Sequence, residues 1–478
     1  HQPPTNPQPT FLWHDYETFG VDPKRDRPAE FAALRTDGDF QPVGEPILLR
    51  CQPTIDYLPD PDACRITGIG PIAALETGVP EHAFAARIFG EMSEPATCVV
   101  GYNSLRFDDE LTRHLFWRNF YDPYAREWQN GNSRFDLIDV MRAAFALRPE
   151  GLVWPRREDG APSFRLDELA PANSIEHSHA HTALADVQAT LALARKLKRA
   201  QPKLLEHALG LRDKQRVLTL LDWQKRTPLV HISQRFPASR GCLAIVVPLA
   251  FHPTQAGKVI VYDSHQDPTA LLSESPERLA EMLVQSGDDG ARTPVGLKLV
   301  HSNKVPFLAP LSVLKGIDTE RIALDSERCQ AHIRSVQSSH GLDRKAQAVF
   351  AALDASRSFD DNDVDSALYD GFIGDNDRKL SMRFRASPAD QLAEMAARFH
   401  DQRLRDLGFR YRARHFPDTL SAVERSLWLA FVRRRLDDGP RTAAQVRERA
   451  LAVDDAIGNE VLAWLDRVAR FHAQASIG

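Results

Sequence analysis

The chain is too long to fold around a single hydrophobic core. It has 478 residues, whereas single cores stop growing at about 250 to 300 residues and most domains have about 100 to 150. Hydrophobic residues make up 43% of the sequence and charged residues 26%, which is the balance of an ordinary globular protein. We therefore expect two or three folded domains.

The secondary-structure patterns change character along the chain and predict three different domains. The first 200 residues have an α/β pattern, with strand-like apolar runs at 11–18, 31–36, 47–51 and 97–102. The next part has short β-rich segments at 229–232, 243–247, 259–262 and 295–300, with one helix near 276–286. Helical patterns dominate from about residue 322, interrupted by an acidic loop at 359–363.

Pro202 marks the first domain boundary, because a helix rarely continues into the residue before a proline. We expect an α/β domain at 11–200, a β domain at 201–355 and an all-helical domain at 356–478. The proline-rich residues 1–10 are expected to form a disordered tail.

Cysteine usage and the lack of long apolar runs limit the class of protein. The five cysteines form an odd set without a CxxC pair, which fits neither a disulfide framework nor a zinc knuckle. No run approaches the roughly 18 to 20 apolar residues needed to span a bilayer. The sequence predicts a soluble, unexported protein of the reducing cytoplasm, without a membrane partner.

Basic residues are concentrated in two places although the net charge is −5. Residues 195–226 contain ten Lys or Arg and three Asp or Glu, and a second group of arginines lies at 403–414 and 433–435. Each group is either a solvated face or a surface for phosphates.

Asp15 and Glu17 are the most informative pair of side chains. They lie two residues apart on a predicted strand, so both point to the same face. Two anionic groups on a buried face repel each other unless a cation lies between them, and hard divalent ions prefer such oxygen ligands. The alternative is the exposed edge of a strand.

A second acidic site lies in the segment His181-x4-Asp186, at the start of a helix marked by Leu184, Val187 and Leu191. We expect Asp186 in the second turn of this helix and His181 at or just before its start. The helix dipole there favours a carboxylate and a neutral imidazole, which can accept a proton from water. The alternative for His181 is a surface or capping histidine.

Asp108 is expected in the first turn of another helix, after a strand and a turn. Its alternative role is simple stabilisation of the helix dipole. The order of the acidic residues carries more information than each residue alone: an Asp-x-Glu pair on the first strand, an Asp about ninety residues later, and then His-x4-Asp on a later helix.

This order resembles the three exonuclease motifs of the histidine subgroup of the DEDD superfamily, whose fold is ribonuclease H-like. The resemblance implies that Asp15, Glu17, Asp108 and Asp186 hold two Mg²⁺ ions, with Mn²⁺ as a substitute, and that His181 is the general base. Two ions can activate water and stabilise the leaving 3′ oxygen.

Longer segments are similar to the bacterial exodeoxyribonuclease I family and extend over nearly the full chain. They are FLWHDYETFG at 11–20, NFYDPY at 119–124, NSRFDL at 132–137, ALRPEG at 146–151, SFRL at 163–166, NSIEH at 173–177, LVHSNK at 299–304, LYDGF at 368–372 and YRARHFP at 411–417. The family implies an exonuclease domain, an SH3-like β domain and a helical domain that enclose a channel for single-stranded DNA. It also implies a monomer that degrades this DNA processively from the 3′ end to 5′-mononucleotides, in DNA repair and recombination.

Family-like segments contain further residues of the types that bind DNA. Aromatic rings stack on any base, and arginines follow phosphates without reading sequence. Trp128 and Phe164 could instead be core residues, and Arg142 a salt-bridge partner. The expected substrate residues, besides Glu17, are Arg113, Tyr124, Trp128, Arg142, Phe164, Arg165 and Lys214, with Arg165 nearest the terminal phosphate.

The family further implies binding of the acidic C-terminal tail of single-stranded DNA-binding protein. Arg148, Lys225 and Arg226 are the candidate residues, while His207 stands where an aromatic residue is expected. Two other functions remain open: a 3′→5′ exoribonuclease with the same catalytic set, and a catalytically idle module that binds single-stranded DNA.

Overall fold

The computed structural model describes residues 7–177, 182–285, 295–357 and 363–475. The chain divides into two compact units, each formed by separate stretches of sequence. The first unit contains residues 1–133, 178–188 and 359–478, and the second contains 134–177 and 189–358. The predicted domain boundaries at 200 and 355 stay predictions.

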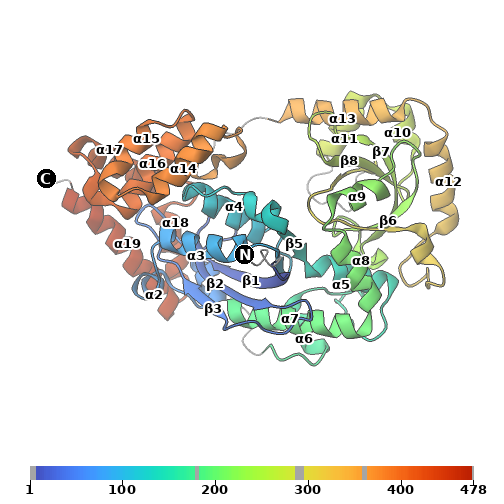
Figure 1. Ribbon diagram of the computed structural model, residues 1–478, viewed down its shortest axis with the longest axis horizontal. Helices are drawn as coiled ribbons and strands as arrows, with labels where there is room; N and C mark the ends of the chain where they lie inside the picture. Colours follow the sequence, from blue (N-terminus) through green and yellow to red (C-terminus); the bar gives the residue numbers. More distant parts are fainter. Residues whose placement is uncertain (1–6, 178–181, 286–294, 358–362, 476–478) are drawn as a thin grey trace, which may run out of the picture. The chain divides into compact units, whose positions relative to one another are not determined.

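A five-stranded mixed sheet has its first four strands in the first unit (Figure 1). Its strands are β1 (Thr10–Thr18), β2 (Pro28–Thr36), β3 (Ile47–Arg50), β4 (Thr97–Gly101) and β5 (Ser133–Asp136), in the order β3-β2-β1-β4-β5. β1 pairs antiparallel with β2 and parallel with β4. Seven of the nine residues of β1 are buried, on both faces of the strand, so its sequence does not alternate between apolar and polar residues.

Two helices cover one face of this sheet. Leu12 and Tyr16 of β1 pack against Phe84 and Ile88 of α3 (Glu81–Ser93) and against Leu111 of α4 (Asp108–Arg118). The opposite face of β1 therefore presents the alternate residues, among them both acidic side chains. The shorter helices α1 (Pro61–Thr67) and α2 (Pro71–Thr77) complete this part of the unit, with the 3₁₀ turns η1 (Ala125–Glu127) and η2 (Gln129–Gly131).

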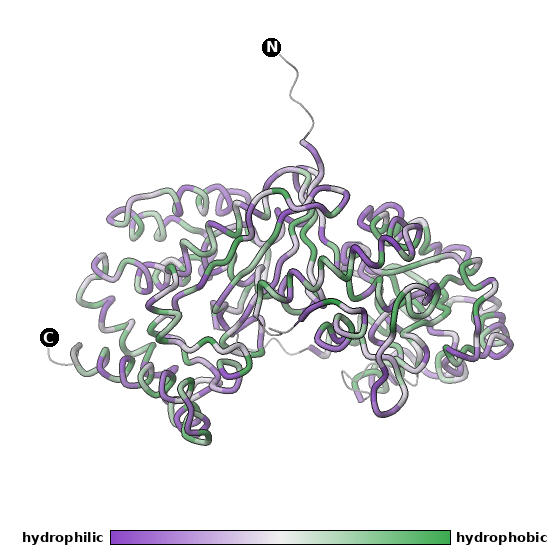
Figure 2. Tube along the Cα trace, turned by 90° about the horizontal axis from the view of Figure 1, so that it is seen from below, coloured by the Kyte–Doolittle hydropathy of each residue, from purple (hydrophilic) through white to green (hydrophobic). Residues whose placement is uncertain are grey.

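The C-terminal part of the first unit is helical throughout its described residues. Its helices show alternating hydrophilic and hydrophobic residues along their length in Figure 2, as expected for helices that bury one face. Phe120, beyond the end of α4, packs against Phe384, Phe399 and Tyr411 of this part, which ties it to the sheet-containing part. The elements are η5 (Val364–Tyr369), α14 (Asp375–Ala386), η6 (Ala389–Gln391), α15 (Leu392–Ala397), α16 (Gln402–His415), η7 (Pro417–Thr419), α17 (Ala422–Asp438), α18 (Ala443–Leu451) and α19 (Ala456–Ala475).

The second unit contains an antiparallel sheet in the order β10-β6-β7-β8-β9. The strands β6 (Leu229–Ile232), β7 (Leu243–Phe251), β8 (Lys258–Asp263) and β9 (Leu297–His301) confirm the four predicted β segments, and β10 (Phe307–Pro310) was not predicted. The helices are α5 (Leu137–Leu147), α6 (Leu166–Ala172), the end of α7 (Ala183–Ala200), α8 (Pro202–Gly210), α9 (Lys214–Leu220), α10 (Thr269–Ser273), α11 (Pro276–Gln285), α12 (Ser326–Gln337) and α13 (Leu342–Ser356), with 3₁₀ turns η3 (Ala238–Arg240) and η4 (Leu311–Leu314).

α7 ends at Ala200 and α8 begins at Pro202, which confirms that the proline interrupts the helix. The acidic loop at 359–362 and residues 1–6 of the predicted tail lie outside the described residues. In the described part of the chain, no helix has the length and apolar character needed to cross a bilayer.

Candidate active site

Three carboxylates come together on the face of β1 that is opposite α3 and α4. Oxygen atoms of Asp15, Glu17 and Asp186 all lie within 4.8 Å of one another. Asp15 and Glu17 share a face because strand residues alternate, which confirms the same-face prediction. Glu17 is 8% exposed, so the alternative of an exposed strand edge is wrong. This arrangement is suited to holding a metal ion.

Asp186 reaches this cluster from the start of α7 and lies one turn earlier in the helix than predicted from the sequence. The helix begins at Ala183, and the Asp186 amide donates a hydrogen bond to the Thr182 carbonyl at 3.0 Å. Asp186 therefore lies in the first turn, and the prediction of the second turn is wrong. His181 lies outside the described residues.

Asp108 begins α4 and is buried, at 5% exposed. It lies close enough to Asp15 for its charge to raise the pKa of that group. The adjacent Asp109 has a different role, because the buried guanidinium of Arg126 binds it at 2.9 Å. The structure thus separates two neighbouring aspartates: Asp108 interacts with the Asp15 carboxylate, and Asp109 is neutralised by an arginine.

The electrostatics of the cluster indicate what it can hold. Burial, followed by the charges of Asp108, Asp186 and Glu17, holds the pKa of Asp15 well above its ordinary value. Burial and the charge of Asp186 raise the pKa of Glu17 to about 8. Burial and like charges destabilise the ionised form of these carboxylates. A bound divalent cation would offset the cost of burial and the repulsion between them. The donor set consists of oxygen atoms, so it fits a hard ion such as Mg²⁺ or Mn²⁺.

Sequence reasoning missed Glu30, which pairs with Glu17 across β1 and β2. The charge of Glu30 also raises the pKa of Glu17, while Arg50 binds Glu30 at 3.0 Å. The apolar patterns predicted both strands, but the register that places the two glutamates opposite each other is a tertiary feature. No signal in the sequence identified this pair.

Besides Glu17, the first unit contains three substrate candidates, which lie near one another on and after α4. Arg113 is buried, binds Glu127 at 2.7 Å and donates to the Tyr369 hydroxyl at 3.1 Å. The ring of Tyr124, at 37% exposed, lies 5.0 Å from the Arg113 guanidinium. Trp128 is 67% exposed, so its alternative as a core residue is wrong. The two rings are accessible to a ligand, and Arg113 is an interior residue that supports Tyr124.

The four substrate candidates of the second unit differ in exposure. Phe164 is buried and packs edge-on against Phe145 and Trp154, which agrees with its alternative as a core residue. Arg142 is also buried and binds Asp139 at 2.9 Å, so it is an interior ion-pair partner rather than a solvated one.

Arg165 has an exposed side chain whose guanidinium binds Asp167 at 2.7 Å. Lys214 is exposed at the start of α9. These two cations are the accessible members of the set.

The partner candidates also lie in the second unit. Arg148 donates to the Val313 carbonyl at 3.2 Å, and Arg226 donates to the carbonyls of Val336 and Ser339 at 2.8 and 2.6 Å. Lys225 is exposed. His207 shares a hydrogen bond of 2.7 Å with the Leu308 carbonyl and packs its ring against Phe307.

The C-terminal arginine group is neither a solvated face nor a phosphate surface over most of its length. Arg412 and Arg414 are buried, and each binds a carboxylate within the first unit, Glu424 and Asp365 respectively. Arg410 and Arg435 likewise form ion pairs with Asp363 and Asp365. A run of arginines in sequence does not reveal partners that are distant in sequence, and these partners neutralise the patch.

Comparisons with known proteins extend over the whole fold. The family models of an exonuclease, an Exonuclease I SH3-like domain and an Exonuclease I C-terminal domain match residues 12–194, 212–352 and 362–473. The chain is 46% identical to exodeoxyribonuclease I of Escherichia coli strain K12 over 88% of the chain and 89% of that protein. It is 44% identical to exodeoxyribonuclease I of Haemophilus influenzae over 90% of the chain and 91% of that protein.

Solved structures agree with the sequence comparison. An exonuclease I from Methylocaldum szegediense has a TM-score of 0.89 at 44% identity and covers 97% of this chain and 99% of its own. E. coli exonuclease I in complex with a dA16 oligonucleotide has a TM-score of 0.88 at 42% identity. The match covers 98% of this chain and 100% of the E. coli chain. The predicted fold class, an α/β exonuclease domain with an SH3-like β domain and a helical C-terminal domain, is confirmed, and the chain belongs to the exodeoxyribonuclease I family of enzymes.

Proposed function

We propose that this enzyme degrades single-stranded DNA from the 3′ end and releases 5′-mononucleotides. The observation that carries the proposal is the cluster of Asp15, Glu17 and Asp186 within 4.8 Å, with the Asp108 charge acting on it. A similar solved structure, that of the E. coli enzyme, contains a dA16 oligonucleotide, which is a single DNA strand.

The four carboxylates are proposed to hold two Mg²⁺ ions, with Mn²⁺ as a substitute. When bound, such ions activate water and stabilise charge on the leaving 3′ oxygen. Asp15 and Glu17 are positioned by β1, Asp108 by the first turn of α4 and Asp186 by the first turn of α7. A solved structure of the E. coli enzyme is described as a zinc ion bound form. An all-oxygen donor set favours Mg²⁺ or Mn²⁺ over zinc, which more often takes nitrogen or sulfur ligands.

His181 is proposed as the general base that accepts a proton from the attacking water. It precedes Asp186 by five residues, at a helix start where the dipole favours the neutral imidazole. Glu17 is proposed to contact the terminal nucleotide in addition to the metal.

The proposed DNA contacts combine stacking with phosphate binding. Tyr124 and Trp128 have accessible rings, and Arg165 and Lys214 have accessible charges. Arg113, Arg142 and Phe164 are buried, and we propose that they support these contacts by positioning the residues around them. Because phosphate contacts release counterions, processive digestion should weaken as salt rises.

Partner binding, location and cellular role belong to the same proposal. One similar solved structure is described as an ExoI/SSB-Ct complex, and the partner candidates here are Arg148, Lys225 and Arg226. Five free, buried cysteines fit a reducing cytoplasm. We propose a monomer that acts in DNA repair and recombination, with domains at 11–200, 201–355 and 356–478.

Digestion of a 5′-labelled DNA strand with and without Mg²⁺ tests this proposal. Successive shortening of the labelled strand only when Mg²⁺ is present would support a metal-dependent 3′→5′ exonuclease. A labelled RNA of the same sequence tests the exoribonuclease alternative, since an RNA enzyme requires contacts to 2′-hydroxyl groups. Binding of DNA without any hydrolysis would instead support an idle binding module.

A further inference from the structure

Glu30 extends the acidic cluster of the candidate active site onto a second strand. Glu30 of β2 lies opposite Glu17 of β1, and Arg50 of β3 lies opposite Glu30. Residues directly opposite each other in neighbouring strands share a face of the sheet, with Cβ atoms about 4.5 to 5.5 Å apart. The three side chains therefore form a charged row across β1, β2 and β3, on the face that carries Asp15.

β2 presents a single charged side chain to this face. The odd-numbered residues Phe31 and Ala33 point the other way and pack in the core with α3. Ala32, on the same face as Glu30, lies opposite Asp15 and has no polar group to offer an ion. The remaining β2 residues on the face of Glu30 are Pro28, Leu34 and Thr36.

The Glu30 carboxylate is buried, and one of its oxygens has a partner in the protein. The side chain is 8% exposed, and Arg50 Nη2 donates to Oε2 at 3.0 Å. Among the residues that the structure describes, Glu30 Oε1 accepts no hydrogen bond. Arg50 is 31% exposed and also donates to Thr77 Oγ1 at 3.3 Å, so water screens its charge. With both glutamates ionised, the row of Glu17, Glu30 and Arg50 keeps a net charge of −1.

The two glutamates repel each other in the absence of a cation. Burial, then the charge of Asp186 and then the charge of Glu30 raise the pKa of Glu17 to about 8. Like charges directly opposite each other destabilise a sheet. A divalent cation held by Glu17 would attract Glu30 as well, so the arrangement is costly without an ion and favourable with one.

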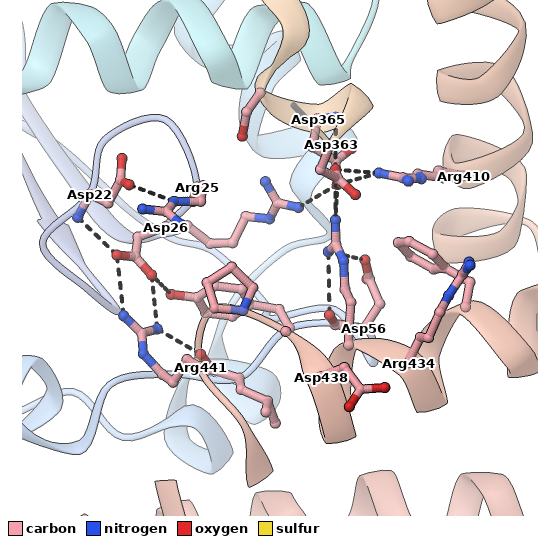
Figure 3. A pocket seen from close by; sticks show the side chains of 18 of the residues that line it. Asp22, Arg25, Asp26, Asp56, Asp363, Asp365, Arg410, Arg434, Asp438 and Arg441 are labelled. Atoms are coloured by element: carbon pink, nitrogen blue, oxygen red, sulfur yellow. Dashed lines mark hydrogen bonds and ion pairs between the residues drawn. The ribbon is translucent and has the colours of Figure 1, made fainter. Parts of the chain in front are cut away.

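Other buried carboxylates of the first unit are neutralised by the protein itself. Figure 3 shows Asp26 paired with Arg441 and Asp365 paired with Arg410, at 2.9 and 3.1 Å. On the face of the sheet that carries the candidate site, Arg50 is the one guanidinium that pairs with a carboxylate of β1 or β2 among the described residues. The row thus differs from the arginine-rich clusters of the same unit in leaving negative charge for a cation.

We propose that Glu30 is a further carboxylate of the metal site, acting from outside the direct ligands, and that Arg50 limits its effect. This inference rests on the metal binding proposed above for Asp15, Glu17, Asp108 and Asp186. Ions such as Mg²⁺ keep part of their water shell, to which a carboxylate beyond the direct ligands can be a hydrogen-bond acceptor. Glu30 has a buried charge and an available oxygen for this role.

Mn²⁺ binding by the metal-free, full-length protein tests this role without DNA and without turnover. The EPR signal of the unbound ion measures the affinity. Glu30→Gln should weaken binding about tenfold, the lower end of the effect of residues beyond the direct ligands. Arg50→Gln should strengthen it about threefold, since the removed cation is partly screened by water. Damage to the fold would weaken binding, so a gain in affinity separates an electrostatic role from a structural one.

The double variant tests whether Arg50 acts through Glu30. Residues that act through each other have non-additive effects. When Glu30 is already glutamine, the further change Arg50→Gln should alter the affinity by less than about twofold. A full threefold gain in that background would overturn the role assigned to Arg50.

Arg35 and Glu91 provide matched controls on the other side of β2. They form an ion pair at 3.5 Å, with Arg35 on β2 and Glu91 on α3. Arg35 is five residues from Glu30, about 17 Å along the strand, which exceeds the screening length of about 10 Å at 0.1 M salt. Arg35→Gln and Glu91→Gln should leave the Mn²⁺ affinity within about twofold of wild type. Thermal melting verifies that every variant is folded.

Asp186→Asn separates failure of this inference from failure of the metal site. It removes a proposed direct ligand and should weaken Mn²⁺ binding more than Glu30→Gln does. If the wild type binds no Mn²⁺, or if Asp186→Asn binds it equally well, both the metal site and the role of Glu30 are overturned. If binding requires Asp186 but is unchanged by Glu30→Gln, or if the control variants change it equally, the role of Glu30 alone is overturned.

Discussion

Replacing Glu17 by glutamine should stabilise the metal-free protein at alkaline pH while it abolishes hydrolysis. Glu17 is buried, and burial together with the charges of Asp186 and Glu30 raises its pKa from 4.5 to about 8. The unfolded chain ionises this group near 4.5, whereas the folded chain retains the proton up to about pH 8. Folding therefore loses stability as the pH rises through this window.

The size of the effect follows from the shift. The pKa of Glu17 rises from 4.5 to about 8 on folding. At 1.36 kcal/mol per pKa unit, ionisation of Glu17 lowers the free energy of unfolding by at most roughly 5 kcal/mol. Glutamine still has to be buried with its amide hydrogen-bonded, so we expect a gain of about 2 to 3 kcal/mol at pH 8.5 and none at pH 4. Urea denaturation in EDTA measures the free energy of unfolding at both values. Mg²⁺ should stabilise the wild type more than the variant, because the variant lacks one proposed ligand.

Glu81 provides the matched control because it is equally buried in the opposite electrostatic environment. Burial alone would raise its pKa, but the charges of Arg118 and Arg27 outweigh burial and lower the pKa to about 2. Its contribution to stability is present above pH 4.5 and is lost as the pH falls toward 2. Glu81→Gln leaves Arg118 without its carboxylate and should destabilise the protein by about 3 to 5 kcal/mol at neutral pH. The reasoning would be refuted if Glu17→Gln destabilised the protein in EDTA at pH 8.5. It would also be refuted if both variants changed the free energy of unfolding in the same direction.

Three further changes test the other proposed roles. Asp186→Asn should abolish Mg²⁺-dependent hydrolysis in a gel assay but preserve DNA affinity in a fluorescence titration; turnover near the wild-type rate would remove Asp186 from the catalytic set. His181→Ala should lower kcat by roughly 10² to 10⁴ and remove the acidic limb of its pH profile, whereas loss of metal affinity with an unchanged profile would make His181 a ligand. Trp128→Ala should weaken binding of a DNA strand by about 1 to 3 kcal/mol with an unchanged salt dependence, and Lys214→Gln should reduce the slope of affinity against salt; the reverse pattern would contradict their assignment to stacking and phosphate contact.

The acidic motifs could be recognised in the sequence because local backbone geometry determines where their side chains lie. Alternation along a strand puts Asp15 and Glu17 on one face whatever the rest of the fold does. A helix start is also a local feature, although the predicted start of α7 was displaced and put Asp186 in the wrong turn. Boundaries of this kind depend on which carbonyl accepts the first helical hydrogen bond, here Thr182, and several residues can serve.

Residue types alone could not separate surface from interior. Phe164 and Trp128 are both aromatic residues in family-like segments, yet Phe164 is buried against Phe145 and Trp128 is 67% exposed. Periodicity is a weak guide for single residues in irregular segments. Only the packing of the surrounding elements decides which ring remains accessible to DNA.

The sequence by itself determined the order of the three domains, the paired carboxylates of β1 and the helices that carry Asp108 and Asp186, because each follows from interactions between residues that are close in the chain. Tertiary structure alone decided the register that sets Glu30 opposite Glu17 and the partners of the C-terminal arginines. Arg414 binds Asp56, 358 residues away along the chain. Charges so distant in sequence interact only after the hydrophobic cores have brought their elements together, so a local pattern of arginines cannot reveal whether it binds DNA or neutralises the protein's own carboxylates.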